Sequence, residues 1–321
     1  MADSERERVL IPVDGSQYAL NAVQYATSIL DPHRFGVVLF HVLTRVPESF
    51  LDLEKMPAYR YRIVNVDAWE QEQEKTIRDF MDSARGMLAA AGFPEEAVTV
   101  RIDERKVGIA RDVAAESRNG YRAVVVGRQG MSELKDFMLG SIAHKILELA
   151  PIPVWIVGGE AAPKKVLMCM DNSEGAMIAA RHLSEVLGAT GRCDVVLFHA
   201  VRGFSGFRKF IRDMFGSEGD QSAVENIEKE LNGAAAALAP SFDKAAGVFA
   251  AAGTDPARIS RKIVPGAGNS GNTIIEEAEK GGFDTIVVGR RGISRAEEFF
   301  MGRVSNKVVH LAKATTVWVV S

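Results

Sequence analysis

The sequence is an internal duplication, and this feature limits the possible folds more than any other. Three blocks of the first half recur in the same order in the second half: Arg8–Ser16 as Lys165–Ser173, Val37–His41 as Val195–His199, and 123–150 as 285–312. The last pair aligns without gaps and is identical at 11 of 28 positions. Chance does not produce three matched blocks in one order, so the 321 residues hold two copies of one unit.

Each copy alternates between short apolar runs and segments with apolar residues at helical spacing. In the first copy, strands are predicted at Val9–Val13, Val37–Val42, Val98–Ile102, Ala123–Val126 and Val154–Val157. Helices are predicted between Ser16 and Leu30 and at Ala68–Ala91, Ile109–Glu116 and Ser141–Leu149. The second copy follows the same pattern from Val166 to Val320. Strands that alternate with helices favour a parallel sheet covered on both faces. We therefore predict an α/β fold of two tandem, doubly wound, five-stranded, mostly parallel sheets, in domains 1–158 and 164–321.

Composition excludes some classes of protein. The apolar fraction of 47% and the charged fraction of 25% are typical of a globular protein. A net charge of −3 gives no electrostatic reason to expect a nucleic acid partner. Cys169 and Cys193 lack metal-ligand or redox spacing. The N-terminal residues are polar, and no apolar run approaches the roughly 18 residues that span a bilayer. The sequence therefore predicts a cytoplasmic protein with no integral membrane segment.

Glycines at fixed spacing follow the fourth strand of each copy. In the first copy, Gly127 and Gly130 are followed, after nine intervening residues, by Gly140 and Ser141, which open a helix. A glycine at a strand end lets a ligand approach the backbone, and a helix N-terminus offers free N–H groups to an anion. In open α/β sheets, ligands lie beyond the carboxyl ends of strands where the strand order reverses. A lone Gly-x2-Gly most often only ends a strand. Because this spacing survives in a duplicated and otherwise diverged segment, we interpret it as a phosphate-binding loop.

These residues resemble the universal stress protein family in its tandem form, over essentially the whole chain. The matching features are Asp14 at the end of the first strand, the Val-x-x-x-His-Val ending of the second, and Gly-x2-Gly-x9-Gly-Ser after the fourth. The resemblance implies the strand order 3-2-1-4-5 and ATP, with or without Mg²⁺, held between the ends of the first and fourth strands. It implies an adenine–ribose side formed by Pro12, Val13, Asp14 and Val42. It implies a ribose–phosphate side formed by Val126, Gly127, Gly130, Gly140, Ser141 and Ile142.

The second copy departs from this pattern. Asp171, Gly289, Gly292 and Gly302 are retained, but Cys169 replaces Pro12, Ala200 replaces Val42, and Arg303 replaces Ser141. The Arg303 guanidinium could bind phosphate in place of the lost hydroxyl, or it could fill the space or pair with Glu297 or Glu298. Because the adenine side has also changed, weak or absent ATP binding is the expected outcome for this copy.

Three other features receive a structural interpretation. Gly266-x-Gly268-x-x-Gly271 matches a dinucleotide-binding pattern but lies in the third strand–helix turn instead of the first, so we interpret it as a glycine-rich turn. His41 and His199 have no evident catalytic partner and are interpreted as hydrogen-bonded structural residues. The basic amphipathic segment 204–215 could bind a membrane or a partner, but a stripe of this kind more often covers a core or a domain interface.

A nucleotide-dependent regulatory protein is the function that the sequence favours. The alternatives are a slow ATPase or phosphotransferase that uses the same crevice, and an interaction protein with decayed pockets. The lysine of a P-loop is absent, so any hydrolysis is expected to be slow. The last strands, Val154–Val157 and Val317–Val320, are apolar edge strands and are expected to pair with each other, antiparallel. A homodimer of the whole chain is left open.

Overall fold

The computed structural model describes residues 6–45, 60–130, 139–159, 163–188, 192–201, 205–265, 270–292 and 301–321, with the side chains of 60–70 and 205–227 left out. The strands of the first half are β1 (Glu7–Pro12), β2 (Phe35–Leu43), β3 (Val98–Glu104), β4 (Tyr121–Gly127) and β5 (Val154–Val157). Those of the second half are β6 (Lys165–Cys169), β7 (Asp194–Val201), β8 (Ile259–Pro265), β9 (Thr285–Gly289) and β10 (Thr316–Val320).

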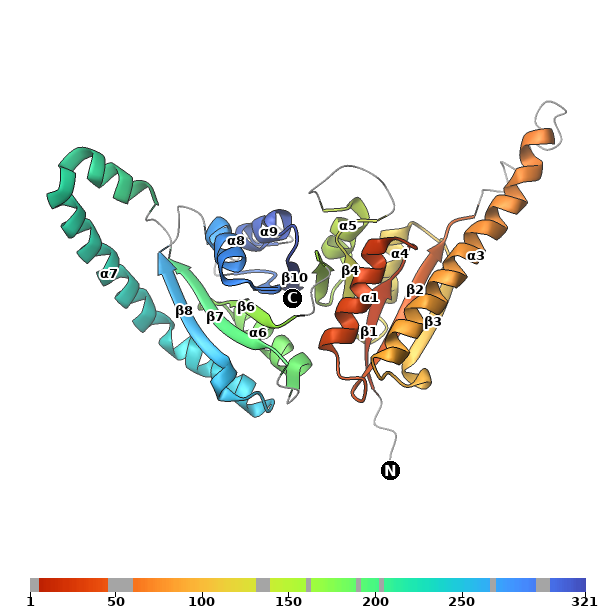
Figure 1. The fold of residues 1–321 in the computed structure, drawn as a ribbon, viewed down its shortest axis with the longest axis horizontal. Coiled ribbons are helices and arrows are strands. Elements are labelled where there is room, and N and C mark those ends of the chain that lie inside the picture. The colour runs from red at the N-terminus through yellow and green to blue at the C-terminus, as the bar shows by residue number, and fades with distance from the viewer. Residues whose placement is uncertain are drawn as a thin grey trace.

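The helices alternate with these strands (Figure 1). They are α1 (Gln17–Ile29), α3 (Arg60–Ala90), α4 (Ile109–Glu116) and α5 (Ser141–Leu149), then α6 (Glu174–Leu187), α7 (Ser205–Ala251), α8 (Ser270–Gly281) and α9 (Arg303–Leu311). The ends of α4, α5 and β5 fall at the predicted residues. Helix α3 begins eight residues before the predicted start at Ala68. The additional turns contain Ile63, Val64 and Val66, whose β-branched side chains have low helix propensity, so the local sequence does not indicate a helix there.

The described strands form one ten-stranded sheet in the order β3-β2-β1-β4-β5-β10-β9-β6-β7-β8. Each half has the predicted order 3-2-1-4-5. Neighbouring strands are parallel except at the centre, where β10 runs antiparallel to β5 with Trp318 opposite Trp155. The two predicted sheets are therefore continuous with each other.

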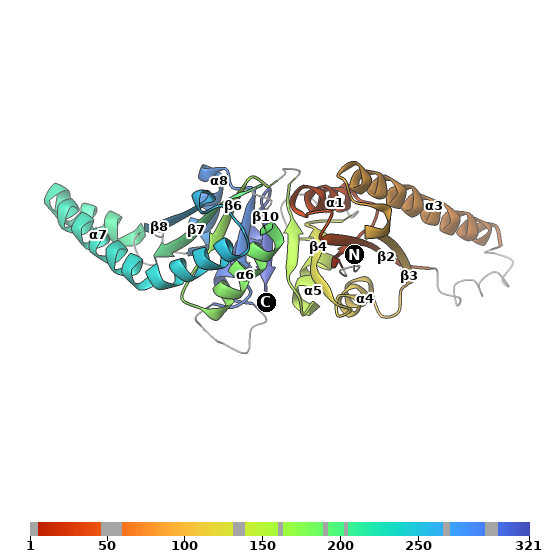
Figure 2. The same ribbon diagram turned by 90° about the horizontal axis from the view of Figure 1, so that it is seen from below.

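Helices cover both faces of this sheet (Figures 1 and 2). Helices α1, α3, α6 and α7 pack on one face, and α4, α5, α8 and α9 pack on the other. The central strands are buried on both sides, which explains their unbroken apolar runs. The outer strands β3 and β8 are only partly buried. Each of the two cores contains residues of both halves.

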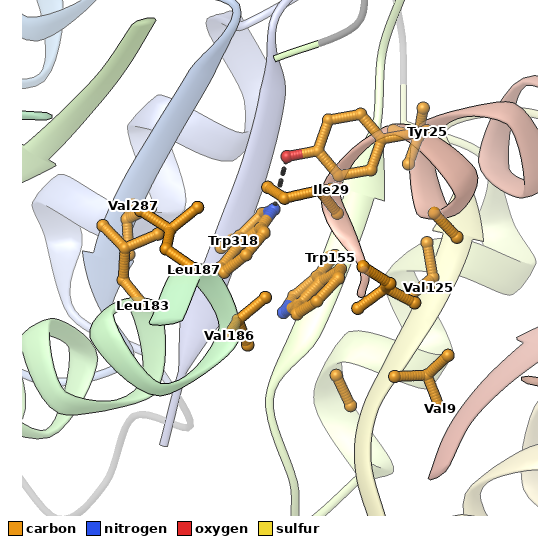
Figure 3. Packing of buried hydrophobic residues seen from close by; sticks show 14 of the residues in the cluster. Val9, Tyr25, Ile29, Val125, Trp155, Leu183, Val186, Leu187, Val287 and Trp318 are labelled. Atoms are coloured by element: carbon orange, nitrogen blue, oxygen red, sulfur yellow. Dashed lines mark hydrogen bonds between the residues drawn. The ribbon is translucent and has the colours of Figure 1, made fainter. Parts of the chain in front are cut away.

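Two tryptophans mark the centre of the molecule (Figure 3). The rings of Trp155 and Trp318 are fully buried and stacked, with centroids 3.8 Å apart and planes 2° from parallel. The Trp318 Nε1 donates to the Tyr25 hydroxyl at 2.9 Å, and the Trp155 Nε1 donates to the His182 Nε2 at 3.1 Å. Tyr25 and His182 are equivalent residues of α1 and α6, so the centre has approximate two-fold symmetry. Burial lowers the pKa of His182 to about 3, and Arg122 contributes, so this imidazole is neutral.

Helices α3 and α7 extend well beyond the sheet (Figure 1). Residues 205–215 of the amphipathic segment lie in α7, but the interpretation of its apolar stripe falls outside the described side chains. Within the described residues, no helix is long and apolar enough to cross a membrane.

Candidate functional site

The carboxyl end of β1 is held by local hydrogen bonds. The Val13 N–H donates to the Phe40 carbonyl of β2 at 2.9 Å. The Asp14 Oδ1 accepts from the Ser16 N–H at 3.0 Å, and the Ser16 hydroxyl caps α1 by accepting from the Ala19 N–H at 3.2 Å. The turn between β1 and α1 therefore fixes the Asp14 carboxylate at the end of the strand.

His41 and its counterpart His199 brace the same turn in the two halves. The His41 Nδ1 lies 2.8 Å from the Val13 carbonyl oxygen, and the His199 Nδ1 lies 2.7 Å from that of Met170. A carbonyl oxygen can only accept, so Nδ1 carries the proton in both residues. Burial lowers the pKa of His41, which keeps the ring neutral near pH 7. The predicted hydrogen bonding of these histidines is confirmed.

The glycines after β4 lie in close contact with other parts of the first half. A Cβ atom at Gly127 would lie 2.5 Å from the Tyr18 carbonyl oxygen, and one at Gly130 would lie 2.6 Å from the Asp14 Oδ2. A Cβ atom at Gly140 would lie 3.2 Å from the Arg128 carbonyl oxygen. Gly127 is thus needed for the close approach of β4 to α1, whereas the sequence analysis explained it by the approach of a ligand.

The second half repeats these contacts. A Cβ atom at Gly289 would lie 2.7 Å from the Gly175 carbonyl carbon, and one at Gly292 would lie 3.0 Å from the Asp171 Oδ2. At Gly302 the nearest atom, the Arg290 carbonyl oxygen, is 3.6 Å away. Backbone packing therefore accounts for much of the repeated glycine spacing, and that spacing alone does not identify a ligand site.

A cavity of about 240 Å³ lies between the ends of β1 and β4. All ten residues predicted for the first copy line it: Pro12, Val13, Asp14, Val42, Val126, Gly127, Gly130, Gly140, Ser141 and Ile142. Six residues that the sequence analysis missed also line it: Ala19, Phe40, Ile109, Val113, Gln129 and Ala143. Ile109 and Val113 lie one turn apart on α4, and Ile109 is 38% exposed. Their helical spacing was visible in the sequence, but the packing of α4 beside this cavity was not.

The cavity has an apolar side and a polar side. Val42, Ile109 and Val113 supply an apolar wall from β2 and α4. On the other side α5 begins at Ser141, and its N-cap residue, Gly140, makes no side-chain cap hydrogen bond. The first N–H groups of a helix have no partner within the helix and carry a partial positive charge. This arrangement suits a ligand with a flat apolar group at one end and an anionic group at the other.

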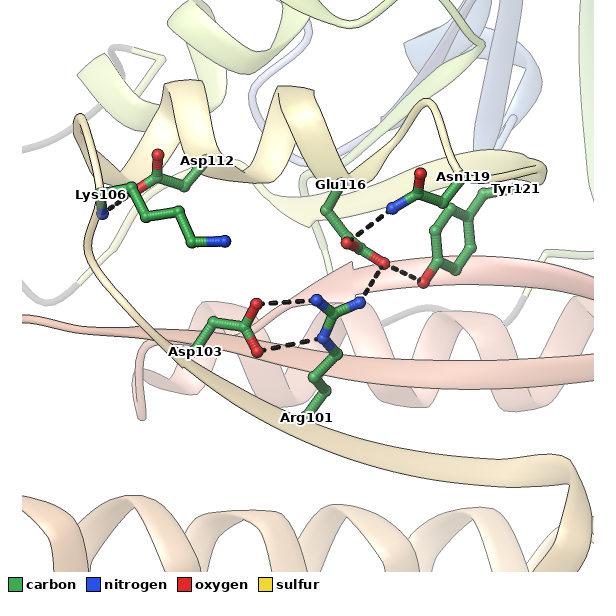
Figure 4. Close-up of polar contacts among 7 residues, drawn as sticks. All are labelled: Arg101, Asp103, Lys106, Asp112, Glu116, Asn119 and Tyr121. Atoms are coloured by element: carbon green, nitrogen blue, oxygen red, sulfur yellow. Dashed lines mark hydrogen bonds and ion pairs between the residues drawn. The ribbon is translucent and has the colours of Figure 1, made fainter.

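A polar cluster fixes α4 behind this cavity (Figure 4). The Arg101 guanidinium donates to both Asp103 carboxylate oxygens, at 3.0 and 2.8 Å, and pairs with Glu116 at 2.8 Å. Glu116 is only 6% exposed and also accepts from the Tyr121 hydroxyl at 2.6 Å and from Asn119 at 2.9 Å. Burial and the bond to Glu116 raise the pKa of Tyr121 to about 12.

This cluster reaches the cavity through an aromatic ring. The Arg101 guanidinium lies 5.6 Å from the centroid of the Phe40 ring, and Phe40 lines the cavity. The ion pair of Arg101 with Glu116 thus links β3 to α4, and the Tyr121 hydroxyl links α4 to the start of β4.

The second half keeps the same frame with different side chains. The Gly302 N–H donates to the Arg290 carbonyl at 2.8 Å, as the Gly140 N–H does to Arg128. Arg303 is exposed at the first residue of α9, and its suggested partners Glu297 and Glu298 lie outside the described residues. Burial raises the pKa of the Cys169 thiol, so this group is neutral.

Two other observations concern ligands. Most of the Gly266–Gly271 pattern lies outside the described residues, although Ser270 and Gly271 begin α8. In the part of the chain that is described, no group of three His, Cys, Asp or Glu side chains is placed to hold a metal ion.

Comparison with known proteins places both halves in one family. The sequence model of the universal stress protein family matches residues 5–158 and again residues 163–321. A universal stress protein of Mycolicibacterium smegmatis is 29% identical over 196 residues, which cover 60% of this chain and 63% of that protein, just under two thirds of its length. Universal stress protein YxiE of Bacillus subtilis is 24% identical over 154 residues, which cover 47% of this chain and 97% of that protein.

A solved structure shows the same overall fold. The crystal structure of a universal stress protein from Archaeoglobus fulgidus aligns with a TM-score of 0.59 and 17% sequence identity, and the alignment covers 99% of each chain. At this identity the likeness concerns the fold alone.

Proposed function

The chain belongs to the universal stress protein family, and from this premise we propose that its first half binds ATP in the cavity between β1 and β4. In this proposal the chain is a stress-response protein in which nucleotide occupancy regulates the surface offered to partners. The observation that supports it is the convergence on one cavity of the ten residues that the family resemblance implies for a nucleotide site.

The two sides of the cavity suit the two ends of ATP. The adenine would pack against Val42, Ile109 and Val113, and the Asp14 carboxylate would accept hydrogen bonds from the ribose hydroxyls. The phosphates would bind at Gly130 and at the N-terminus of α5, where backbone N–H groups and the Ser141 hydroxyl are donors. Magnesium, if bound, would accompany the phosphates as a neutralising charge.

Binding without efficient hydrolysis fits the residues that line the cavity. Asp14 is the one ionisable side chain among the described lining residues, and its Oδ1 already accepts from Ser16. The described lining thus supplies no lysine or arginine to stabilise charge on a transferred phosphate. We propose a binding protein with at most slow hydrolysis.

The proposal also covers how the two halves are held together and where the protein is located in the cell. We propose that β5 and β10 hold the two halves together in solution through their antiparallel pairing. A cytoplasmic location belongs to the proposal as well, and self-association of the whole chain is left open.

The test is direct identification of the nucleotide. Protein purified without added nucleotide is denatured, the released small molecules are identified by mass spectrometry, and the emptied protein is titrated with ATP and with GTP in a calorimeter. We expect ATP among the released molecules and tighter binding of ATP than of GTP. Absence of released nucleotide together with no heat on ATP addition would contradict the proposal.

A further inference from the structure

At the centre of the molecule, one arginine of each half reaches into the other half. Arg290 directly follows β9 in the second half, and its guanidinium donates from Nη1 to the Ala150 carbonyl at 3.1 Å and from Nη2 to the Leu147 carbonyl at 2.6 Å. Arg128 directly follows β4 in the first half and donates to the Val309 and His310 carbonyls at 2.8 and 3.0 Å. Each arginine therefore binds the C-terminal end of a helix that belongs to the other half.

The helix that Arg290 binds is the helix that begins at the proposed phosphate site. Helix α5 has nine residues, and the Leu147 carbonyl is one of the last four, which lack partners within the helix. A cation at this end also interacts favourably with the helix dipole. At the opposite end, the Gly140 N–H donates to the Arg128 carbonyl at 2.8 Å. A helix this short is marginal on its own, so bonds at both ends determine its position.

Burial of these two arginines between the halves carries a cost in free energy. Arg128 is 3% exposed, and burial lowers the pKa of both guanidinium groups. Within the described residues neither has a carboxylate partner, and the Nε of each is buried without a hydrogen bond. A buried charge without a counter-ion costs free energy that an apolar side chain of similar volume would not. What the guanidinium supplies, and an apolar side chain cannot, is a directed pair of donors for the helix end.

We propose that Arg290 is a positioning residue for the first half's nucleotide site, acting through α5. By holding the last turn, it fixes the N-terminus of α5, about 13 Å away along the helix, where the phosphates would bind. This inference rests on the proposed function. It gives the second half a role in ATP binding that does not require a working site of its own.

The chain provides its own matched control. Arg290→Met removes the side-chain bonds to α5. Arg128→Met removes the equivalent side-chain bonds to α9 and keeps both the Arg290 bonds to α5 and the backbone carbonyl of residue 128, which accepts from the Gly140 N–H. We expect Arg290→Met to weaken ATP binding about tenfold, within the usual range for coupling between distant groups, and Arg128→Met to weaken it less than about threefold. Arg290→Lys, which keeps a cation at the helix end, should recover part of the loss. Equal losses in the two methionine variants, or none in Arg290→Met, would overturn the proposal.

A measurement without nucleotide separates this proposal from the assignment of ATP. Hydrogen exchange of the α5 backbone amides should be faster in Arg290→Met than in the parent, whereas Arg128→Met should accelerate exchange in α9 instead. If the parent chain fails to bind ATP but α5 responds in this way, the ligand assignment fails and the positioning by Arg290 stands. Unchanged exchange in α5 of Arg290→Met would overturn the positioning itself.

Discussion

The two halves have nearly the same backbone frame and different side chains in it. In both, a histidine Nδ1 bonds the carbonyl after the first strand, and a helix-opening glycine donates at 2.8 Å to the arginine carbonyl after the fourth. At the residues that would face a nucleotide, Pro12, Val42 and Ser141 are replaced by Cys169, Ala200 and Arg303. Duplication has thus kept the contacts that shape the loops, while the side chains at the proposed ligand site have diverged.

The polar contacts around the third strand and the helix that follows it also differ between the halves. In the first half, Arg101 binds Asp103 and Glu116, and Tyr121 donates to Glu116. The second half has a simpler pair, Lys262 with Glu277 at 2.6 Å, and Phe283 has no hydroxyl to donate. Lysine gives a single point of contact where arginine gives a planar fork. We infer that the apolar wall is held more firmly in the half that would bind ATP.

The largest expected effect tests whether the halves are equivalent at their junction. Trp155→Ala and Trp318→Ala should each lower the free energy of unfolding by about 3–5 kcal/mol, since each removes a fully buried ring from the stack. Trp155→Ala should be worse by about 1 kcal/mol, because His182 loses its donor, whereas Tyr25 still has Thr285 at 2.8 Å. Urea unfolding measures both. A loss below about 1 kcal/mol in either variant would show that the stack does not hold the molecule together.

The next test places the ligand in one half. Gly140 has φ −59° and ψ 144°, which valine adopts without strain. Its Cβ would lie 3.2 Å from the Arg128 carbonyl oxygen and from the Gln129 Cα, so Gly140→Val adds bulk to the cavity and also presses on the loop after β4. We expect ATP affinity to fall at least about a hundredfold, which is about 2.7 kcal/mol. Gly302→Val is the matched control in the second half and should leave the affinity unchanged. Equal titrations for the parent and Gly140→Val would show that the ligand lies elsewhere.

Tyr121→Phe gives the first half the residue that the second half has. It should cost about 1 kcal/mol, the value of one hydrogen bond. Tyr121 has a raised pKa in the folded protein, from 10.0 to about 12, so the folded state holds this proton more tightly than the unfolded state. Its contribution to stability is complete below pH 10 and is lost as the pH rises towards 12. The difference between parent and variant should therefore shrink over this range, and a difference independent of pH would contradict the assignment.

The smallest effect concerns Arg303. If this exposed arginine obstructs the second site, Arg303→Ser should add weak ATP binding there and leave the affinity of the first site within about twofold. Titration of this variant in the Gly140→Val background isolates the second half. Loss of a second site already present in the parent would show instead that the arginine is a ligand.

Some features of the fold and of the candidate site could be predicted from the sequence, and others could not. The difference lies in whether a feature depends on local spacing or on packing between distant segments. The alternation of strands and helices follows from short-range patterns that recur in both copies, whereas the strand order and the ten residues around the cavity were implied by the resemblance to the universal stress protein family. Ile109, Phe40 and Gln129 were missed because their place in the cavity depends on how α4 and the loop after β4 pack, which local spacing does not encode. The start of α3 was wrong because β-branched residues lower helix propensity without preventing a helix.

The packing contacts that require these glycines could not be predicted from the sequence either. The spacing of Gly127, Gly130 and Gly140 suggested a ligand, but the contacts of Gly127 with Tyr18 and of Gly130 with Asp14 show that packing needs the same residues. Arg128 and Arg290 occupy the same place in the two glycine loops, and nothing in the local sequence indicates what they bind. Only the joining of the two halves shows that each caps a helix of the other.

We propose one nucleotide site per chain, in the first half. The most direct test is to count the ATP molecules bound per chain. Equilibrium dialysis with labelled ATP at saturation, on the parent and on Gly140→Val, gives both number and location. We expect one ATP per chain in the parent and none in Gly140→Val. Two equivalent ATP molecules per parent chain, or one retained by Gly140→Val, would contradict it.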